Sequence, residues 1–186
     1  LMGWVDWLRE HPEKIEEIIP EMEMDLLRLE QIGRRFSKMG TKSDFEEFDL
    51  SERIERIVDY LNKRLPSFGK KVILRNDIDP GIIIFANGSL LAWSIENIIR
   101  NGIDAIERDD GIVSVSLRKY DDEIKIRIQD NGRGIPKKDW KNIFRPGFST
   151  KKAGWGLGLS LSSRIIEDIH GGQLKVYDSN NDIGTT

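Results

Sequence analysis

The sequence has 186 residues, of which 38% are hydrophobic and 33% charged, so it holds enough apolar material for one domain with an appendage or for one larger domain. Its formal net charge of -3 and the lack of a long basic stretch argue against nucleic-acid binding. The absence of cysteine excludes a disulfide framework, two histidines are too few for a typical zinc site, and no apolar run reaches the ~18 residues that span a bilayer.

A helical pattern begins near residue 13. Apolar side chains then recur at intervals of seven, at Ile15, Met22, Leu29 and Phe36, which indicates a helix that packs against another helix. Pro20 lies inside the pattern, so the helix begins there or is kinked there. The pattern alone fits an ordinary core helix and also half of a dimerising helical hairpin. The turn-forming residues 40–44 follow and are the best candidate for a domain boundary.

The next segments predict alternating helices and strands. A helix is expected from about residue 50, capped by Asp49 or Ser51 and ended by Pro66 with Gly69. Two strand-like segments, 71–75 and 82–85, are joined by a turn. A long helix is then expected at residues 90–106.

The second half of the chain predicts a hairpin and a long loop. Residues 112–117 and 124–128 both alternate between apolar and polar side chains, with a short turn between them, which is typical of a β-hairpin. Residues 136–154, which we call the lid loop, are expected to form a long loop with one helical turn at 138–143. Loops of that length are usually functional. We expect a helix at 157–169, ended by His170 and two glycines, and a final strand at 173–177.

The helix at 90–106 carries a polar stripe. Asn97, Asn101 and Asp104 are spaced to share one face, and Arg100 lies beside them. Amide oxygens are suitable ligands for Mg²⁺, which in turn holds phosphate oxygens. The alternative is a solvated face with a few helix–helix hydrogen bonds. Gly102 costs about 1 kcal/mol against alanine inside a helix, which indicates that another group approaches closely there.

A second candidate site follows the predicted hairpin, at Asp130-Asn131-Gly132-Arg133-Gly134. A buried carboxylate at a strand end can accept a hydrogen bond from the exocyclic amine of adenine, and Gly132 and Gly134 allow the backbone to approach a flat ring. A simple tight turn after a strand is the alternative. A calcium loop is excluded because its later acidic ligands are missing.

A third candidate site is the glycine-rich segment 154–159, which opens the last helix. Glycine-rich backbone at a helix N-terminus can hold phosphate, since its free N–H groups and the helix dipole favour anions. The glycine spacing fits neither a dinucleotide-binding nor a Walker motif. Upstream, Phe144 and Phe148 are candidates to anchor the lid loop. Lys151 is a candidate to meet a terminal phosphate, with a solvated lysine as the alternative.

In combination, these segments resemble the ATP-binding domain shared by sensor histidine kinases, type II topoisomerases, Hsp90 and MutL. Residues 97–105 resemble its N box, 130–134 its first glycine box, 144–151 its F box and lid, and 154–159 its second glycine box. The resemblance covers about residues 45–186. It implies a two-layer α/β sandwich, the Bergerat ATP-binding fold, with ATP between the helices and the lid, Mg²⁺ on Asn101 and adenine on Asp130.

The resemblance also implies roles for individual residues. The catalytic residues would be Asn97, Arg100 and Lys151. The residues implied to contact the nucleotide are Asn97, Asn101, Asp104, Asp130, Gly132, Gly134, Ile135, Phe144, Phe148, Ser149, Thr150, Lys151, Gly154, Trp155, Gly156, Leu157, Gly158 and Thr185.

Among the branches of this family, the chain is most similar to the histidine kinases. The ATP-hydrolysing branch typically has a glutamate four residues before the metal-binding asparagine, to activate water, and this chain has Asn97 there. Glu96 is one residue away and about 100° around the helix, so it should point elsewhere. The alternatives are an ATP-hydrolysing clamp of the gyrase, Hsp90 or MutL type and a non-catalytic dimerisation module.

The histidine-kinase interpretation predicts two domains. Residues 1–42 would be part of a dimerisation and histidine-phosphotransfer helical hairpin, and residues 43–186 would be the catalytic ATP-binding domain. The γ-phosphoryl group of ATP would pass to a histidine of the hairpin and then to a response-regulator receiver domain. The partners implied are ATP or ADP, a second copy of the full protein and that regulator, and the expected location is cytoplasmic, although the full protein can be membrane-anchored.

The sequence departs from the kinase pattern in one important respect, because the phosphoacceptor motif is absent. His11 precedes a proline, and His170 is best interpreted as a helix C-terminal residue. We therefore expect a fragment that begins after that motif, binds nucleotide and does not phosphorylate itself. Trp155 is bulky where threonine or serine is usual, and Gly102 replaces the common alanine.

Overall fold

The computed structural model describes residues 12–16, 19, 45–68, 71–107, 109–151, 156–180 and 184–186. The chain separates into two compact units, Leu1–Ser43 and Asp44–Thr186. In the first unit, a short 3-10 helix, η1 (Pro12–Lys14), lies among the described residues. The seven-residue pattern of residues 21–39, His11 and the predicted hairpin lie outside them and stay predictions.

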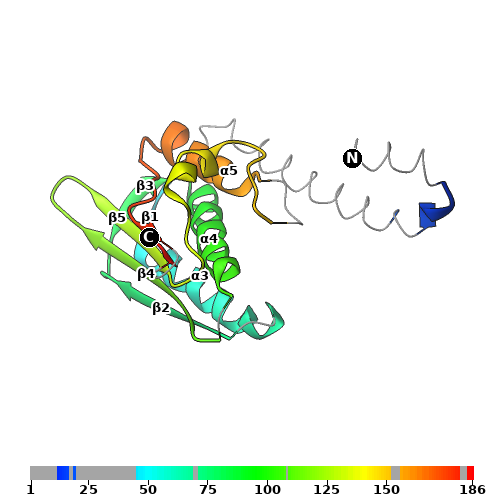
Figure 1. The fold of residues 1–186 in the computed structure, drawn as a ribbon. Coiled ribbons are helices and arrows are strands. Elements are labelled where there is room, and N and C mark those ends of the chain that lie inside the picture. Colours follow the sequence, from blue (N-terminus) through cyan, green and yellow to red (C-terminus); the bar gives the residue numbers. More distant parts are fainter. Residues whose placement is uncertain are drawn as a thin grey trace. The chain divides into compact units, whose positions relative to one another are not determined.

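The second unit is a mixed α/β domain (Figure 1). Its helices and strands, in chain order, are β1 (Glu46–Asp49), α3 (Leu50–Arg64), η3 (Leu65–Phe68), β2 (Val72–Ile78), β3 (Ile83–Ala86), α4 (Gly88–Ala105), β4 (Gly111–Lys119), β5 (Ile124–Asp130), η4 (Lys137–Asp139), η5 (Asn142–Phe144), α5 (Gly158–Arg164), the π-helical turn η6 (Ile165–Ile169), β6 (Ser179–Asn180) and β7 (Gly184–Thr185).

The main sheet has the order β2-β4-β5, with β2 parallel and β5 antiparallel to β4. Two smaller antiparallel pairs, β1 with β3 and β6 with β7, complete the described strands. Helices α3 and α4 pack against the main sheet, and Figure 1 shows them together on one of its faces. The predicted two-layer α/β sandwich and the β4–β5 hairpin are therefore confirmed.

The core lies between these two layers. Along β4 the buried side chains alternate with half-buried ones, because successive residues of a strand point to opposite faces. Each of the two helices presents an apolar stripe to the buried face of the sheet. The side chains with the least exposure include Ile54, Leu61, Ile99, Ile103, Val113 and Leu117. The position of α4 in this core fixes which of its faces remains polar and accessible.

The start of α3 distinguishes between the two predicted caps. The backbone N–H of Glu52 donates to Asp49 Oδ1 at 3.1 Å, so Asp49 is the N-cap. Ser51 is buried instead, and its hydroxyl donates to the carbonyl oxygen of Asp79 at 2.7 Å and accepts from the N–H of Ile82 at 3.1 Å. The serine therefore ties α3 to the turn between β2 and β3.

The structure corrects the prediction at three places. Strand β1 was not predicted, and β2 extends to Ile78. The strand predicted at 173–177 was wrong, because the N–H groups of Gly172 and Leu174 bond to the carbonyl of Ile166 and the carboxylate of Glu167. Strand β6 begins only at Ser179, although the N–H of Tyr177 already donates to the carbonyl of Thr186 at 2.8 Å.

Within the described part of the chain, no helix is long and apolar enough to cross a membrane.

Candidate functional site

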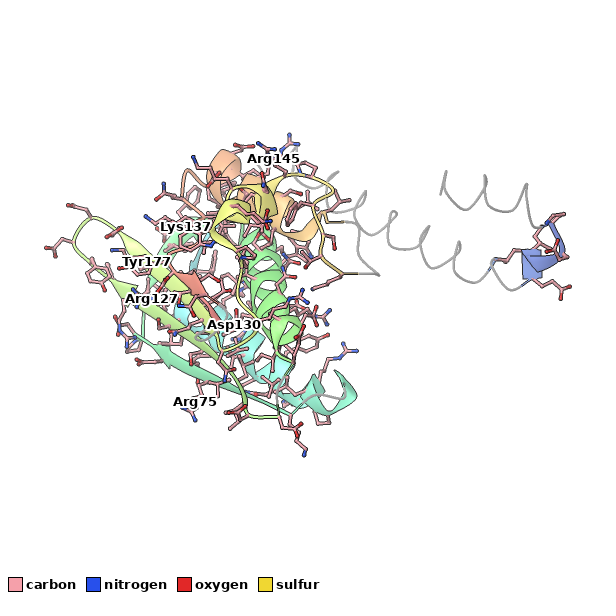
Figure 2. The ribbon with its side chains drawn as sticks, in the orientation of Figure 1. Arg75, Arg127, Asp130, Lys137, Arg145 and Tyr177 are labelled. Atoms are coloured by element: carbon pink, nitrogen blue, oxygen red, sulfur yellow. The ribbon has the colours of Figure 1, made fainter. Side chains whose placement is uncertain are left out.

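Asp130 is the last residue of β5, and it is buried, with 8% of its surface exposed. Figure 2 shows it where the strand ends, beside α4. Its Oδ1 accepts hydrogen bonds from the N–H groups of Gly132 at 2.8 Å and Thr185 at 3.3 Å. Burial raises the pKa of the Asp130 carboxyl, and the two backbone hydrogen bonds oppose that rise. A carboxylate held this way can accept a further hydrogen bond from a ligand donor.

The glycine inside α4 lies against this carboxylate. A Cβ atom on Gly102 would be 3.4 Å from Asp130 Cβ and 3.6 Å from Asp130 Oδ2. The sequence predicted a close approach at Gly102, and the approaching group is the Asp130 side chain. Both distances are ordinary van der Waals contacts, so the backbone has room for an alanine at this position.

Glycine is required at positions 132 and 134, after Asp130, for two different physical reasons. A Cβ atom on Gly132 would be 2.5 Å from the carbonyl oxygen of Ala105, at the end of α4, which rules out any larger residue there. Gly134 has a φ of +70°, a backbone conformation that favours glycine. The glycine at 132 is thus required by helix packing, and the bend it permits leaves Asp130 facing α4.

Asn131 clamps the same turn to the start of β4. Its Oδ1 accepts from the N–H of Ile112 at 2.7 Å, and its backbone N–H donates to the carbonyl of Ile112 at 3.1 Å. Its Nδ2 donates to the carbonyl of Asp110 at 2.9 Å. The asparagine therefore fixes the backbone immediately after the buried carboxylate.

The polar face of α4 is divided between two neighbours. Asn97 turns toward α5, where its Nδ2 donates to Ser162 Oγ at 3.0 Å and its Oδ1 would lie 2.6 Å from a Cβ atom on Gly158. Arg100 Nε lies 3.2 Å from Glu96 Oε1, so Glu96 is paired along the helix with the arginine that lies beside the stripe. Asn97 is consequently a contact between the two helices in this structure.

One turn further along α4, the structure brings Asn101 and Asp104 to the lid loop. Lys151 Nζ donates to Asn101 Oδ1 at 3.1 Å and to Asp104 Oδ2 at 2.6 Å. An amide and a carboxylate oxygen that converge on one cation suit a hard divalent metal such as Mg²⁺. The described residues contain no group of three or more histidine, cysteine, aspartate or glutamate side chains arranged for a metal, so other ligands, such as phosphate oxygens and water, would have to complete its shell.

The lid loop is closed at its base. The N–H of Gly147 donates to the carbonyl of Gly156 at 3.1 Å, and Gly156 has a φ of +63° with Phe148 backbone atoms in the place of a Cβ. Near the tip, Arg133 Nη2 donates to Thr150 Oγ1 at 2.8 Å. Ser149 Oγ accepts from the N–H of Lys151 at 3.1 Å and shapes the turn before the lysine.

The aromatic anchors predicted for the lid loop are both half-buried. Phe144 ends η5 and Phe148 follows it, whereas Ile143 between them and the start of η5 is buried, with 8% exposure. The sequence missed Ile143 because a single isoleucine in a loop has no periodic partner. Gly154 and Trp155 lie outside the described residues, so their predicted roles stay predictions.

Ile135 and Thr185 meet through Ser179, which the sequence reasoning did not identify. Ser179 Oγ accepts from the N–H of Ile135 at 2.7 Å and lies 2.8 Å from Thr185 Oγ1. Trp140 Nε1 donates to the carbonyl of Ile135 at 2.9 Å. Gly184 has a φ of +81°, and a Cβ atom on it would overlap the backbone carbonyl oxygen of Asp130. No pattern in the sequence indicates that a lone serine joins these segments.

Helix α5 begins at Gly158, after Leu157, whose side chain makes no capping hydrogen bond. The predicted phosphate-binding role of this helix start stays a prediction. Its position is nevertheless informative, because Gly158 lies against Asn97 of α4. The candidate phosphate-binding segment and the polar stripe are therefore neighbours.

The fold and this geometry define an α/β ATP-binding domain with a lid over one helix. Residues 87–186 match the family described as "Histidine kinase-, DNA gyrase B-, and HSP90-like ATPase", and the chain belongs to that family. Its curated relatives include a sporulation kinase and a signal transduction histidine-protein kinase, and the domain is of the histidine-kinase type.

Among curated proteins, the chain is similar to sporulation kinase B of Bacillus subtilis (strain 168), with 31% identity over 153 residues that make up 79% of this chain and 34% of that protein. It is also similar to the signal transduction histidine-protein kinase AtoS of Escherichia coli (strain K12), with 40% identity over 103 residues, or 55% of this chain and 16% of that protein. The chain spans about a third of the length of sporulation kinase B and a smaller share of AtoS.

Among solved structures, the catalytic domain of histidine kinase ThkA matches with a TM-score of 0.64 and 25% identity over 75% of this chain and 90% of that one. The mycobacterial sensor histidine kinase MprB matches with a TM-score of 0.62 and 26% identity, over 71% of this chain and 84% of that one. Both comparisons support the sandwich fold expected for ATP-binding domains of this family.

Proposed function

We propose that residues 44–186 are the catalytic ATP-binding domain of a sensor histidine kinase, which transfers the γ-phosphoryl group of ATP to a histidine of a dimerisation domain. The observation that carries this proposal is the convergence of two distant segments on α4. Asp130, from the end of β5, faces Gly102, and Lys151, from the lid loop, reaches Asn101 and Asp104. The buried carboxylate of β5, suited to adenine, thus lies beside the polar, cation-binding face of α4, suited to phosphates.

In this proposal, Asp130 Oδ2 accepts a hydrogen bond from the exocyclic amine of adenine, while Oδ1 keeps its hydrogen bonds from the N–H groups of Gly132 and Thr185. Gly132, Gly134, Ile135 and Thr185 form the wall around the base. The Lys151 ammonium and the backbone at Gly156, Leu157 and Gly158 neutralise and hold the phosphates. The remaining proposed contacts from the lid loop and beyond are Phe144, Phe148, Ser149, Thr150, Gly154 and Trp155.

Asn101 is the proposed Mg²⁺ ligand, supported by its oxygen's convergence with Asp104 on a cation. The metal would supply positive charge to the transferring phosphoryl group. Asn97 and Arg100 complete the catalytic face of α4, Asn97 by holding the start of α5 in place. The pairing of Glu96 with Arg100 supports phosphoryl transfer over water activation by that glutamate.

The histidine that receives the phosphoryl group would come from outside the described residues. His170 is engaged at both ring nitrogens, since Nε2 accepts from the N–H of Asn87 at 3.1 Å and Nδ1 lies 2.7 Å from the carbonyl of Ile165. We expect the full protein to act as a homodimer in the cytoplasm and to pass the phosphoryl group to a response-regulator receiver domain. The chain alone should not phosphorylate itself, and acid-labile label after incubation with radiolabelled ATP would contradict this.

Calorimetric titration with ATP and ADP, with and without Mg²⁺, tests the proposal. The wild-type chain should bind both nucleotides, Asp130→Ala should lose affinity for both, and Asn101→Ala should lose mainly the part that depends on Mg²⁺. Retained affinity in Asp130→Ala would refute the adenine site. Steady ATP hydrolysis that disappears in Glu96→Ala would refute the kinase assignment in favour of a hydrolase.

A further inference from the structure

The ammonium group of Lys151 attaches the lid loop to α4. Lys151 Nζ donates to Asn101 Oδ1 at 3.1 Å and to Asp104 Oδ2 at 2.6 Å, and the two acceptors lie one helical turn apart. The segments that meet here are separated by about 50 residues in the chain. The ammonium therefore stands where the oxygens of the proposed metal-binding face converge.

This arrangement cannot persist when a metal binds Asn101. Mg²⁺ takes its oxygen ligands at about 2.0–2.1 Å, so an ammonium on the same oxygen must move away, both for lack of space and because the two cations repel each other. The phosphates of a nucleotide give the displaced ammonium a new anionic partner. Lys151 would thus exchange its two acceptors on α4 for phosphate oxygens when metal and nucleotide bind.

The described part of the lid loop has two further contacts. The N–H of Gly147 donates to the carbonyl of Gly156 at 3.1 Å. A second contact holds the tip, since Arg133 donates to Thr150 Oγ1 at 2.8 Å and pairs with Glu107 at 3.1 Å. The lysine contact is the one that involves the candidate metal site.

We propose that Asp104 is a positioning residue that latches Lys151 onto α4 before nucleotide arrives, and that the binding of metal and nucleotide transfers the ammonium from Asp104 to the phosphates. This proposal rests on the proposed function for the second half of the exchange. The latch itself concerns only contacts of the nucleotide-free chain. We call the Lys151–Asp104 pair, with its Asn101 contact, the lysine latch.

The strength of the lysine latch suits a reversible contact. The side chains of Lys151 and Asp104 are 36% and 52% exposed, so water and salt screen their attraction. Exposed pairs of this kind shift an equilibrium by up to about fivefold. The latch is therefore strong enough to bias the lid loop and weak enough for nucleotide to displace it.

A double-mutant cycle in nucleotide binding separates the latch from a general charge effect. Asp104→Asn removes the charge with little change of shape, and it should tighten the affinity for Mg²⁺-ATP by up to about fivefold in the wild-type background. In a Lys151→Met background the same change should no longer tighten binding, because no ammonium has to be displaced. Equal tightening in both backgrounds, or weaker binding in Asp104→Asn, would overturn the proposal.

The nucleotide-free state gives an independent readout through trypsin, which must take the Lys151 side chain into its own specificity pocket. Asp104→Asn should speed cleavage after Lys151 several-fold in the absence of nucleotide, and added salt should speed it in the wild type. Asp168→Asn is the matched control, because it removes an exposed carboxylate paired with Arg164 and should leave cleavage unchanged.

The two experiments also distinguish the latch from the proposed function. Absence of nucleotide binding by the wild-type chain would refute the proposed function and the exchange with it. Normal nucleotide binding, with the same cleavage rate in Asp104→Asn as in the wild type, would overturn the latch alone.

Discussion

The burial of Asp130 has a cost for the fold that binding a ligand can offset. Burial raises the pKa of its carboxyl above the ordinary value of 3.8, against the opposing hydrogen bonds from Gly132 and Thr185. Between the two pKa values the folded state binds more protons than the unfolded state, so stability falls as pH rises through this window. The contribution of this carboxyl is complete below about pH 3.8 and is lost above the folded-state pKa.

We therefore predict that Asp130→Asn makes the nucleotide-free chain more stable at pH 7, because the amide removes a buried charge and its Oδ1 can still accept the two backbone hydrogen bonds. The gain should shrink as pH falls toward about 4, where the wild-type carboxyl becomes neutral. Urea unfolding between pH 4 and pH 8 measures both effects.

The exposed Asp168 provides the control, because Asp168→Asn removes a carboxylate whose side chain is 70% exposed. The difference in unfolding free energy between Asp168→Asn and the wild type should not vary with pH in the way predicted for Asp130→Asn. A less stable Asp130→Asn chain at pH 7 would contradict the prediction. Asp130→Asn should also bind ATP more weakly, since its amide N–H groups would face the hydrogen-bond donor of adenine. Higher stability with lower ATP affinity would show that the charged carboxylate serves binding at the expense of folding.

Single residues of the site were predictable from sequence where their chemistry recurs at a spacing. Asn101, Asp130 and Lys151 belong to segments whose order and residue types are distinctive. The roles of Asn131 and Ser179 were not predictable, because each depends on backbone groups brought in by another segment. A polar side chain that binds distant backbone leaves no periodic signal.

At the scale of elements, α4 is the helix on which both the core and the site depend. One side carries Ile95, Ile99 and Ile103 into the core, and the other carries the polar stripe. Its N-cap is Asn87, whose Oδ1 accepts from the N–H of Leu90 at 3.0 Å. The helix was predicted well because its apolar spacing is a local property of the sequence.

Short strands were predicted poorly for the complementary reason. Strand β1 is defined by pairing with a remote segment, since it pairs with β3 across α3 and β2. Strands β6 and β7 pair with each other, but with two residues each they are too short to show an alternating pattern. Residues 173–177 have a strand-like pattern, but the end of the preceding helix takes up N–H groups just before and within this segment. Local propensity could not show that competition.

Two buried serines on neighbouring helices lead to opposite predictions. Ser94 in α4 and Ser162 in α5 are both 0% exposed, but Ser94 Oγ has no hydrogen-bond partner among the described residues, whereas Ser162 Oγ accepts from Asn97. Ser94→Ala should stabilise the chain by about 1 kcal/mol, because it removes an unsatisfied hydroxyl and favours the helix. Thermal unfolding should show a melting temperature about 2–4 °C higher.

Ser162→Ala is the matched variant, and it should destabilise the chain by about 1–3 kcal/mol because it leaves the Asn97 amide without this acceptor. The two variants delete the same atom from equally buried positions. Destabilisation of similar size in both would show that the Ser94 hydroxyl has a partner and would contradict the prediction.

At the scale of the whole domain, contacts between remote segments hold the layers around the site. His170 follows η6, and its Nε2 accepts a hydrogen bond from the N–H of Asn87, the residue that caps α4. The two residues are 83 positions apart in the chain. The same ring lies 2.7 Å through Nδ1 from the carbonyl of Ile165 and stacks on Phe45 at 5.2 Å. Because Nε2 accepts, the proton is on Nδ1 and donates to that carbonyl. The imidazole thus joins three segments of the domain.

His170→Phe separates hydrogen bonding from ring stacking, because the new ring can still pack on Phe45 while both hydrogen bonds are lost. The N–H of Asn87, a residue with 3% exposure, would then lack its acceptor, so we expect a loss of about 1–3 kcal/mol in the free energy of unfolding. Phe45→Leu, which removes the stacking and keeps both hydrogen bonds, should cost about 1 kcal/mol or less beyond the lost area. Denaturant unfolding of the two variants measures the difference, and a His170→Phe chain as stable as the wild type would contradict a bridging role.

The nucleotide affinity of His170→Phe should stay close to that of the wild type under conditions where the variant is folded, because the ring supports α4 and makes none of the proposed contacts with ATP.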